Sequence, residues 1–142
     1  MSQMPPFLLG YRQALRDVQR AVLLRGRTRS GPPSAWSAVL VAGDWISVPL
    51  RQLRETGIRS LDPQVRELMS TPSTKQSDFD QGYQAGFDKA VEVVAGWGRK
   101  MNNPAARDAI GETVEGLQQA RLQMISNEGE KIRTLRKRKF AI

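Results

Sequence analysis

Apolar residues at helical spacing constrain the fold of this chain more than any other feature. Near the N-terminus, apolar side chains step by three or four positions: Leu8, Tyr11, Leu15, Val18 and Val22. This spacing places them on one face of an amphipathic helix from roughly Pro6 to Leu24. Pro5 and Pro6 suit its start, because a proline at the first helical position gives up no hydrogen bond.

A second stripe predicts another helix between Ser77 and Lys100. Its members are Phe79, Tyr83, Phe87, Ala90, Val94 and Trp97. Gly82 and Gly86 lie four residues apart in this segment, a spacing that allows close packing against a second helix. Asn103 and Pro104 then start a long last helix, which we expect to reach about Lys139 with a break or bend near Gly129.

The segment between the two stripes is predicted to contain a β-hairpin. Residues 36–42 are rich in β-formers, Gly43-Asp44 supplies a turn, and residues 45–48 return as the second strand. Residues 25–35 ("RGRTRSGPPSA") precede the hairpin and are predicted to form a flexible basic loop, because glycine, serine and two prolines interrupt the first helix.

Residues 48–69 ("VPLRQLRETGIRSLDPQVRELM") predict two short helices around a glycine turn. Leu50 and Leu53 give the first helix an apolar face, and Gly57 ends it. Ile58 is expected to be buried beneath the turn, and the second helix begins near Pro63. The pattern is similar to a DNA-reading helix-turn-helix, and with a preceding strand it is similar to a winged helix. A ribbon-helix-helix and a plain helical hairpin remain alternatives.

These patterns predict a mainly α fold. We expect a small helical domain with one β-hairpin, a candidate helix-turn-helix or winged-helix-like element and a long C-terminal helix. Residues 1–72 would form a basic N-terminal module of helix, hairpin and helix pair. Residues 73–142 would form a C-terminal helical packing or oligomerisation module with a basic tail.

The charge of the chain indicates its class of partner rather than its fold. The net charge is +8, and 16 of the 22 basic residues are arginine, which binds phosphate bidentately and stacks on bases. Residues 1–70 carry +5, residues 71–130 carry −3 and residues 131–142 carry +6. The positive charge is therefore concentrated in the front half and in the C-terminal tail.

Several classes of site are absent from the sequence. The chain has no cysteine and no histidine, which removes thiolate metal sites, cysteine nucleophiles and the commonest general base. Residues 78–82 ("DFDQG") lack the later ligands of a calcium loop. We expect no enzyme activity, no cofactor and no metal.

The chain has no long apolar run and no secretory signal. We therefore expect no membrane partner and a cytoplasmic location, or a virion location for a phage component.

The function expected from these features is non-catalytic nucleic-acid binding, with DNA more probable than RNA. The alternative is a structural assembly subunit, for example a phage virion or nucleoprotein component, that forms homo-oligomers or joins a larger assembly through its C-terminal helices. The candidate nucleic-acid-binding residues are Arg12, Arg16, Arg20, Arg25, Arg27, Arg29, Arg51, Arg54, Arg59, Ser60, Gln64, Arg66, Lys131, Arg133, Arg136, Lys137, Arg138 and Lys139.

Overall fold

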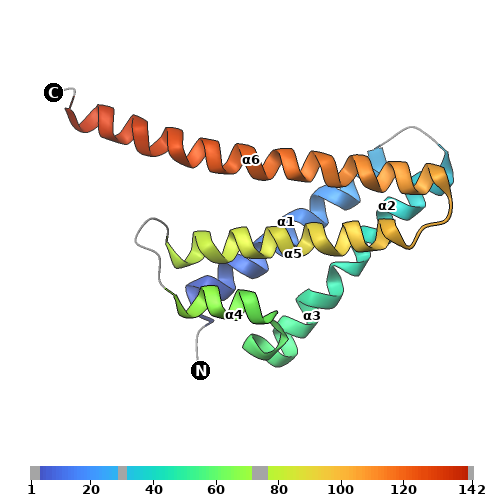
Figure 1. The fold of residues 1–142 in the computed structure, drawn as a ribbon, viewed down its shortest axis with the longest axis horizontal. Helices are drawn as coiled ribbons and strands as arrows, with labels where there is room; N and C mark the ends of the chain where they lie inside the picture. Colours follow the sequence, from blue (N-terminus) through green and yellow to red (C-terminus); the bar gives the residue numbers. More distant parts are fainter. Residues whose placement is uncertain (1–3, 29–31, 72–76, 141–142) are drawn as a thin grey trace.

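The computed structural model describes residues 4–28, 32–71 and 77–140, and side-chain positions for residues 4–27, 32–71 and 77–123. It is all-α over the described residues (Figure 1). The elements in chain order are α1 (Pro6–Thr28), α2 (Pro33–Trp45), α3 (Ser47–Thr56), the 3₁₀ helix η1 (Gly57–Ser60), α4 (Pro63–Ser70), α5 (Asp78–Arg99) and α6 (Pro104–Phe140). None of these helices is long and apolar enough to cross a membrane in the part of the chain described.

Helices α1 and α5 lie side by side and run in the same direction at the centre of the molecule (Figure 1). Their backbones touch at glycines. A Cβ atom on Gly82 would collide with the carbonyl oxygen of Phe7, and one on Gly86 would collide with that of Tyr11. The predicted role of the glycine pair in close helix packing is therefore confirmed.

The predicted stripe of the first helix forms the core. Leu8, Tyr11, Leu15, Val18 and Val22 are each at most 4% exposed. They pack with buried residues of α2, α3, α5 and α6 in one cluster, so helices from both halves of the sequence contribute to a single core. The second stripe is buried at Phe87, Ala90 and Val94, but Phe79 is 40% exposed.

The predicted β-hairpin is wrong, because residues 36–48 lie in α2 and the start of α3, and no described residue lies in a strand. Ala35, Ala38, Val39 and Ala42 are spaced for a helix, and all four are buried. That helical face packs against α1 and α6, and its burial outweighs the β-propensity of the local sequence. The winged-helix and ribbon-helix-helix alternatives, which need those strands, are wrong as well.

The predicted helix, turn and helix after the hairpin are present as α3, η1 and α4. Gly57 ends α3 with φ +58° and ψ −128°, and such a positive φ is readily adopted by glycine, which has no Cβ atom. Ile58 is not buried beneath the turn, because it is 43% exposed. Asp62 occupies the N-cap position of α4, but its side chain makes no capping hydrogen bond. Its carboxylate instead accepts a hydrogen bond from Lys89 Nζ of α5 at 3.1 Å.

Helix α6 begins as predicted. The side chain of Asn103 accepts hydrogen bonds from the backbone N–H groups of Ala105 (2.9 Å) and Ala106 (3.2 Å). The helix has 37 residues, about 55 Å at 1.5 Å per residue, and it continues past the first turn of α5 (Figure 1). It runs through Gly129 without interruption, so the predicted break is absent.

Candidate nucleic-acid interface

Four of the predicted arginines line one groove between α1 and α3. Its volume is about 400 Å³. We call it the arginine groove, and the residues that line it are Met4, Arg12, Arg16, Ser47, Leu50, Arg51 and Arg54. Arg12 is half-buried and the other three arginines are exposed. None of the lining residues is acidic.

The helical geometry explains why these arginines meet. Arg12 and Arg16 are four residues apart on α1, and Arg51 and Arg54 are three apart on α3, so each pair shares a helix face. Helix α3 continues the path of α2 back along α1. Gln19 of α1 holds this junction, because its Nε2 donates to the carbonyl of Gly43 (3.1 Å) and to Ser47 Oγ (2.7 Å).

The acidic residue closest in sequence to the groove arginines of α1 is engaged elsewhere. Asp17 accepts hydrogen bonds from Tyr83 Oη of α5 and from Gln13 Nε2, both at 2.8 Å. Burial and this hydrogen bond raise the pKa of Tyr83 to about 12. Over the described residues, none of the four groove arginines forms an ion pair. Like charges one helical turn apart cost roughly 0.2–0.5 kcal/mol per pair, a repulsion that a bound anion would relieve.

If α3, η1 and α4 act as a helix-turn-helix, the residues expected to read base edges are those at the start of the second helix: Arg59, Ser60, Gln64 and Arg66. None of them lines the arginine groove. Arg59 is exposed on η1, and Gln64 and Arg66 are exposed on α4, which packs against α5. Ser60 is half-buried, and its hydroxyl donates to the carbonyl of Gly57 at 2.8 Å. The structure therefore separates the arginine groove on α1 and α3 from a second polar surface on η1 and α4.

The arginines expected in a flexible loop lie mostly in a helix. Arg25 and Arg27 belong to the last turn of α1, and Arg29 lies outside the described residues. Arg20 is exposed on α1 beyond the groove. The loop prediction is wrong for Arg25 and Arg27, because α1 extends to Thr28 before the prolines that start α2.

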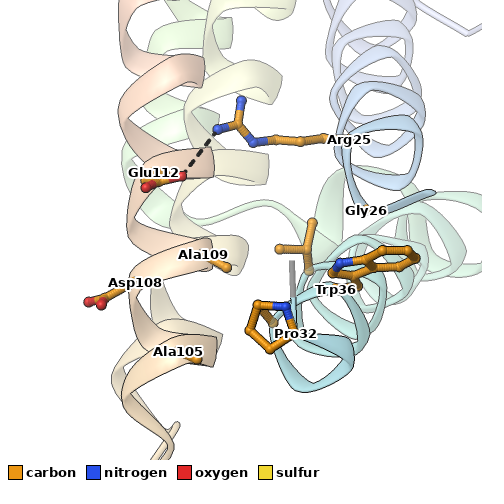
Figure 2. A pocket seen from close by; sticks show the side chains of 10 residues that line it. Arg25, Gly26, Pro32, Trp36, Ala105, Asp108, Ala109 and Glu112 are labelled. Carbon is orange, nitrogen blue, oxygen red and sulfur yellow. Dashed lines mark ion pairs between the residues drawn. The ribbon is translucent and has the colours of Figure 1, made fainter. Parts of the chain in front are cut away.

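Arg25 lines a different pocket of about 210 Å³ between α1, α2 and α6. Figure 2 shows it reaching toward Glu112, with a nitrogen–oxygen distance of 3.8 Å, while the ring of Trp36 lies on the α2 side of the pocket. The Arg25 Nε and Trp36 Nε1 atoms are buried without a hydrogen-bond partner among the described residues. Arg25 thus helps to connect α1 to α6 rather than joining the arginine groove.

The cations of the predicted basic tail lie on the C-terminal part of α6. The backbone is helical as far as Phe140, whereas the side chains of Lys131, Arg133, Arg136, Lys137, Arg138 and Lys139 lie outside the described side chains. Their role in binding stays a prediction.

One aromatic site was not predicted from the sequence. Trp45 of α2 packs on Trp97 of α5, with ring centroids 5.3 Å apart, beside the exposed residues Arg99 and Lys100. Because Trp45 was assigned to a β-strand, its position on a helix that faces α5 was not predicted. Only the composition, three tryptophans in a chain with few aromatic residues, hinted at such a site.

Among the described residues, the structure contains no group of three or more carboxylates close enough together to hold a metal ion. Comparison of the chain with protein-family models, curated proteins and solved structures finds no match. Its function therefore has to be inferred from the geometry of its surfaces.

Proposed function

We propose that this protein binds nucleic acid without catalysing a reaction, DNA before RNA, and that the arginine groove is where phosphates bind. The observation that carries the proposal is the convergence of Arg12, Arg16, Arg51 and Arg54 around a groove without an acidic lining residue. Guanidinium groups match phosphate oxygens with paired N–H donors. Neutralised phosphates release condensed counterions, which drives association.

The rest of the charge supports the same function. The six tail cations on α6 would add contacts to the backbone of the nucleic acid without sequence preference. DNA is preferred because α3, η1 and α4 form a helix, a turn and a second helix. Arg59, Gln64 and Arg66 on η1 and α4 would then be the base-reading side chains. We place the protein in the cytoplasm, or in a virion if it belongs to a phage particle, and infer that it acts as a homo-oligomer or within a larger assembly.

A matched pair of variants on α1 tests the groove. Arg16→Gln removes one charge from the groove, whereas Arg20→Gln removes the same charge one helical turn away, outside it. Binding to a labelled random-sequence DNA duplex is measured by fluorescence anisotropy at several salt concentrations. We expect Arg16→Gln to weaken binding several-fold and to reduce the slope of log affinity against log salt by about 1. Arg20→Gln should keep the wild-type slope.

Two results would contradict the proposal. If the two variants lose affinity and slope equally, the net charge binds the duplex and the groove has no special role. If wild-type protein leaves duplex DNA and single-stranded RNA unbound even at low salt, nucleic-acid binding itself is wrong.

The second candidate, a structural assembly subunit, is favoured by an open apolar groove between α5 and α6. It has a volume of about 610 Å³, and its lining consists of Ala95, Gly98, Arg99, Arg107, Ile110, Gly111 and Val114. An apolar groove of this kind suits the apolar core of an interface between copies of the chain. A Cβ atom at Gly111 would meet nothing within 4 Å, so Gly111→Glu should leave the fold intact. It should dissociate an oligomer that uses this groove, as measured by sedimentation velocity.

A further inference from the structure

A pair of tryptophans forms an aromatic surface near the C-terminal end of α5. The rings of Trp45 and Trp97 have centroids 5.3 Å apart and planes tilted by 32°. Trp97 is half-buried, whereas Trp45 is 45% exposed. Part of the Trp45 ring therefore covers Trp97, and the remainder faces solvent. Exposing this much of a large aromatic side chain leaves hydrophobic surface available to a ligand.

A hollow of about 280 Å³ lies beside this pair. We call it the tryptophan platform, and its lining residues are Trp45, Glu92, Val93, Gly96, Trp97, Arg99 and Lys100. Gly96 has no side chain to fill the hollow. A Cβ atom added there would approach only Arg99 Nη2, at 3.6 Å. Arg99 and Lys100 are both exposed. An aromatic floor is thus combined with two cations at the end of α5.

We propose that the tryptophan platform binds an unpaired nucleobase, which stacks on Trp45 while its phosphates contact Arg99 and Lys100. This inference rests on the proposed function and adds single-stranded nucleic acid as a ligand class. Stacking on aromatic side chains beside cations is how proteins bind single strands with little sequence preference. Glu92, the only carboxylate among the lining residues described, can accept a hydrogen bond from the amino group of a base.

The platform lies next to the arginine groove in the chain. Trp45 ends α2 and lines the platform, whereas Ser47 begins α3 and lines the groove. Two residues apart, their Cα atoms are separated by at most about 7.6 Å. Because Ile46 keeps helical backbone angles, side chains two residues apart point roughly 200° away from each other around the helix. The platform therefore faces α5 and the groove faces α1, and a strand that reaches both has to pass around the α2–α3 path. A duplex keeps its bases paired and stacked, so it gains nothing from the platform.

The decisive experiment compares three ligands on the full-length protein: single-stranded oligo(dA), an abasic strand of equal length and a DNA duplex. Fluorescence anisotropy measures the affinity of wild type and Trp45→Leu for each. We expect Trp45→Leu to weaken oligo(dA) binding at least roughly 5-fold, since one base stack is worth at least about 1 kcal/mol. The affinities for the abasic strand and the duplex should stay unchanged.

A second variant makes the experiment independent of the stability of Trp45→Leu. Gly96→Leu fills the hollow at a position where a Cβ atom has room, and it leaves both tryptophans and the charge in place. It should weaken oligo(dA) binding to a similar extent while circular dichroism reports an intact fold.

The failures of the two proposals are distinguishable. If Trp45→Leu and Gly96→Leu both bind oligo(dA) as tightly as wild type, or if the abasic strand binds as tightly as oligo(dA), the platform does not stack bases. Duplex binding that depends on Arg16 would still support the proposed function in that case. If no nucleic acid binds at low salt, both proposals are overturned.

Discussion

The backbone contact between α1 and α5 gives the sharpest prediction for stability. Replacing Gly82 by alanine adds one methyl group where α1 leaves no space. The new Cβ atom would lie 2.7 Å from the carbonyl carbon of Phe7 and collide with its oxygen. These are backbone atoms, so no side-chain rotation can relieve the overlap, and the two helices have to move apart.

The expected magnitude follows from two opposing effects. In a free helix, alanine is more favourable than glycine by about 1 kcal/mol. Overpacking a filled interface costs typically about 1–3 kcal/mol, and a collision with rigid backbone belongs at the upper end of that range. We therefore expect Gly82→Ala to lower the free energy of unfolding by about 2 kcal/mol. At about 3–4 °C per kcal/mol for a chain of this length, the melting temperature should fall by about 6–8 °C.

Gly111→Ala is the matched control, because the same substitution on α6 meets nothing within 4 Å. It should raise the free energy of unfolding by about 1 kcal/mol, which separates the two variants by about 3 kcal/mol. Urea unfolding followed by far-ultraviolet circular dichroism measures both. If Gly82→Ala proves as stable as Gly111→Ala, the close approach of α1 and α5 is wrong.

Two further predictions concern side chains that hold α1 and α4 to α5. Lys89→Met should cost about 1 kcal/mol, because it removes a half-buried ion pair to Asp62 with a nitrogen–oxygen distance of 3.1 Å; hydrogen exchange should quicken in α4 and stay unchanged in α1. The pKa of Tyr83 is raised to about 12 in the folded protein from 10.0, so the unfolded chain ionises first. The stability that this group contributes is complete below about pH 10 and is lost as the pH rises toward 12. Unfolding curves across this range should fall more steeply for wild type than for Tyr83→Phe, and parallel curves would contradict the assignment.

The helices that the sequence predicted well are those whose apolar stripe is long. The stripe from Leu8 to Val22 is buried as expected, and the stripe from Phe79 to Trp97 is buried at Phe87, Ala90 and Val94. Both helices were recognised because a helix of five or six turns repeats its spacing often enough. Two helices begin at a side-chain cap. Ser77 accepts a hydrogen bond from the backbone N–H of Asp80 at 3.1 Å, and Asn103 caps α6.

The hairpin prediction failed because α2 is short and its environment decides its structure. Val39 and Val41 favour strands in isolation, and the run of apolar residues from 38 to 42 hides the helical spacing. What the sequence alone could not supply was the presence of neighbours on two sides, α1 and α6. Between them, alanines and glycines allow close packing; a Cβ atom on Gly43, for example, would lie 2.9 Å from Leu23 Cδ2.

The error in secondary structure also explains why the arginine groove was not predicted as one site. A hairpin at residues 36–48 would turn the chain back on itself before Arg51 and Arg54. Instead, α2 passes through the fully buried Ile46 into α3 with little change of direction, since Ile46 keeps helical backbone angles of −65° and −21°. The continued path carries α3 along α1 toward its N-terminus. Arginines separated by more than 30 residues in sequence meet across one groove because a segment with the composition of a strand folds as a helix.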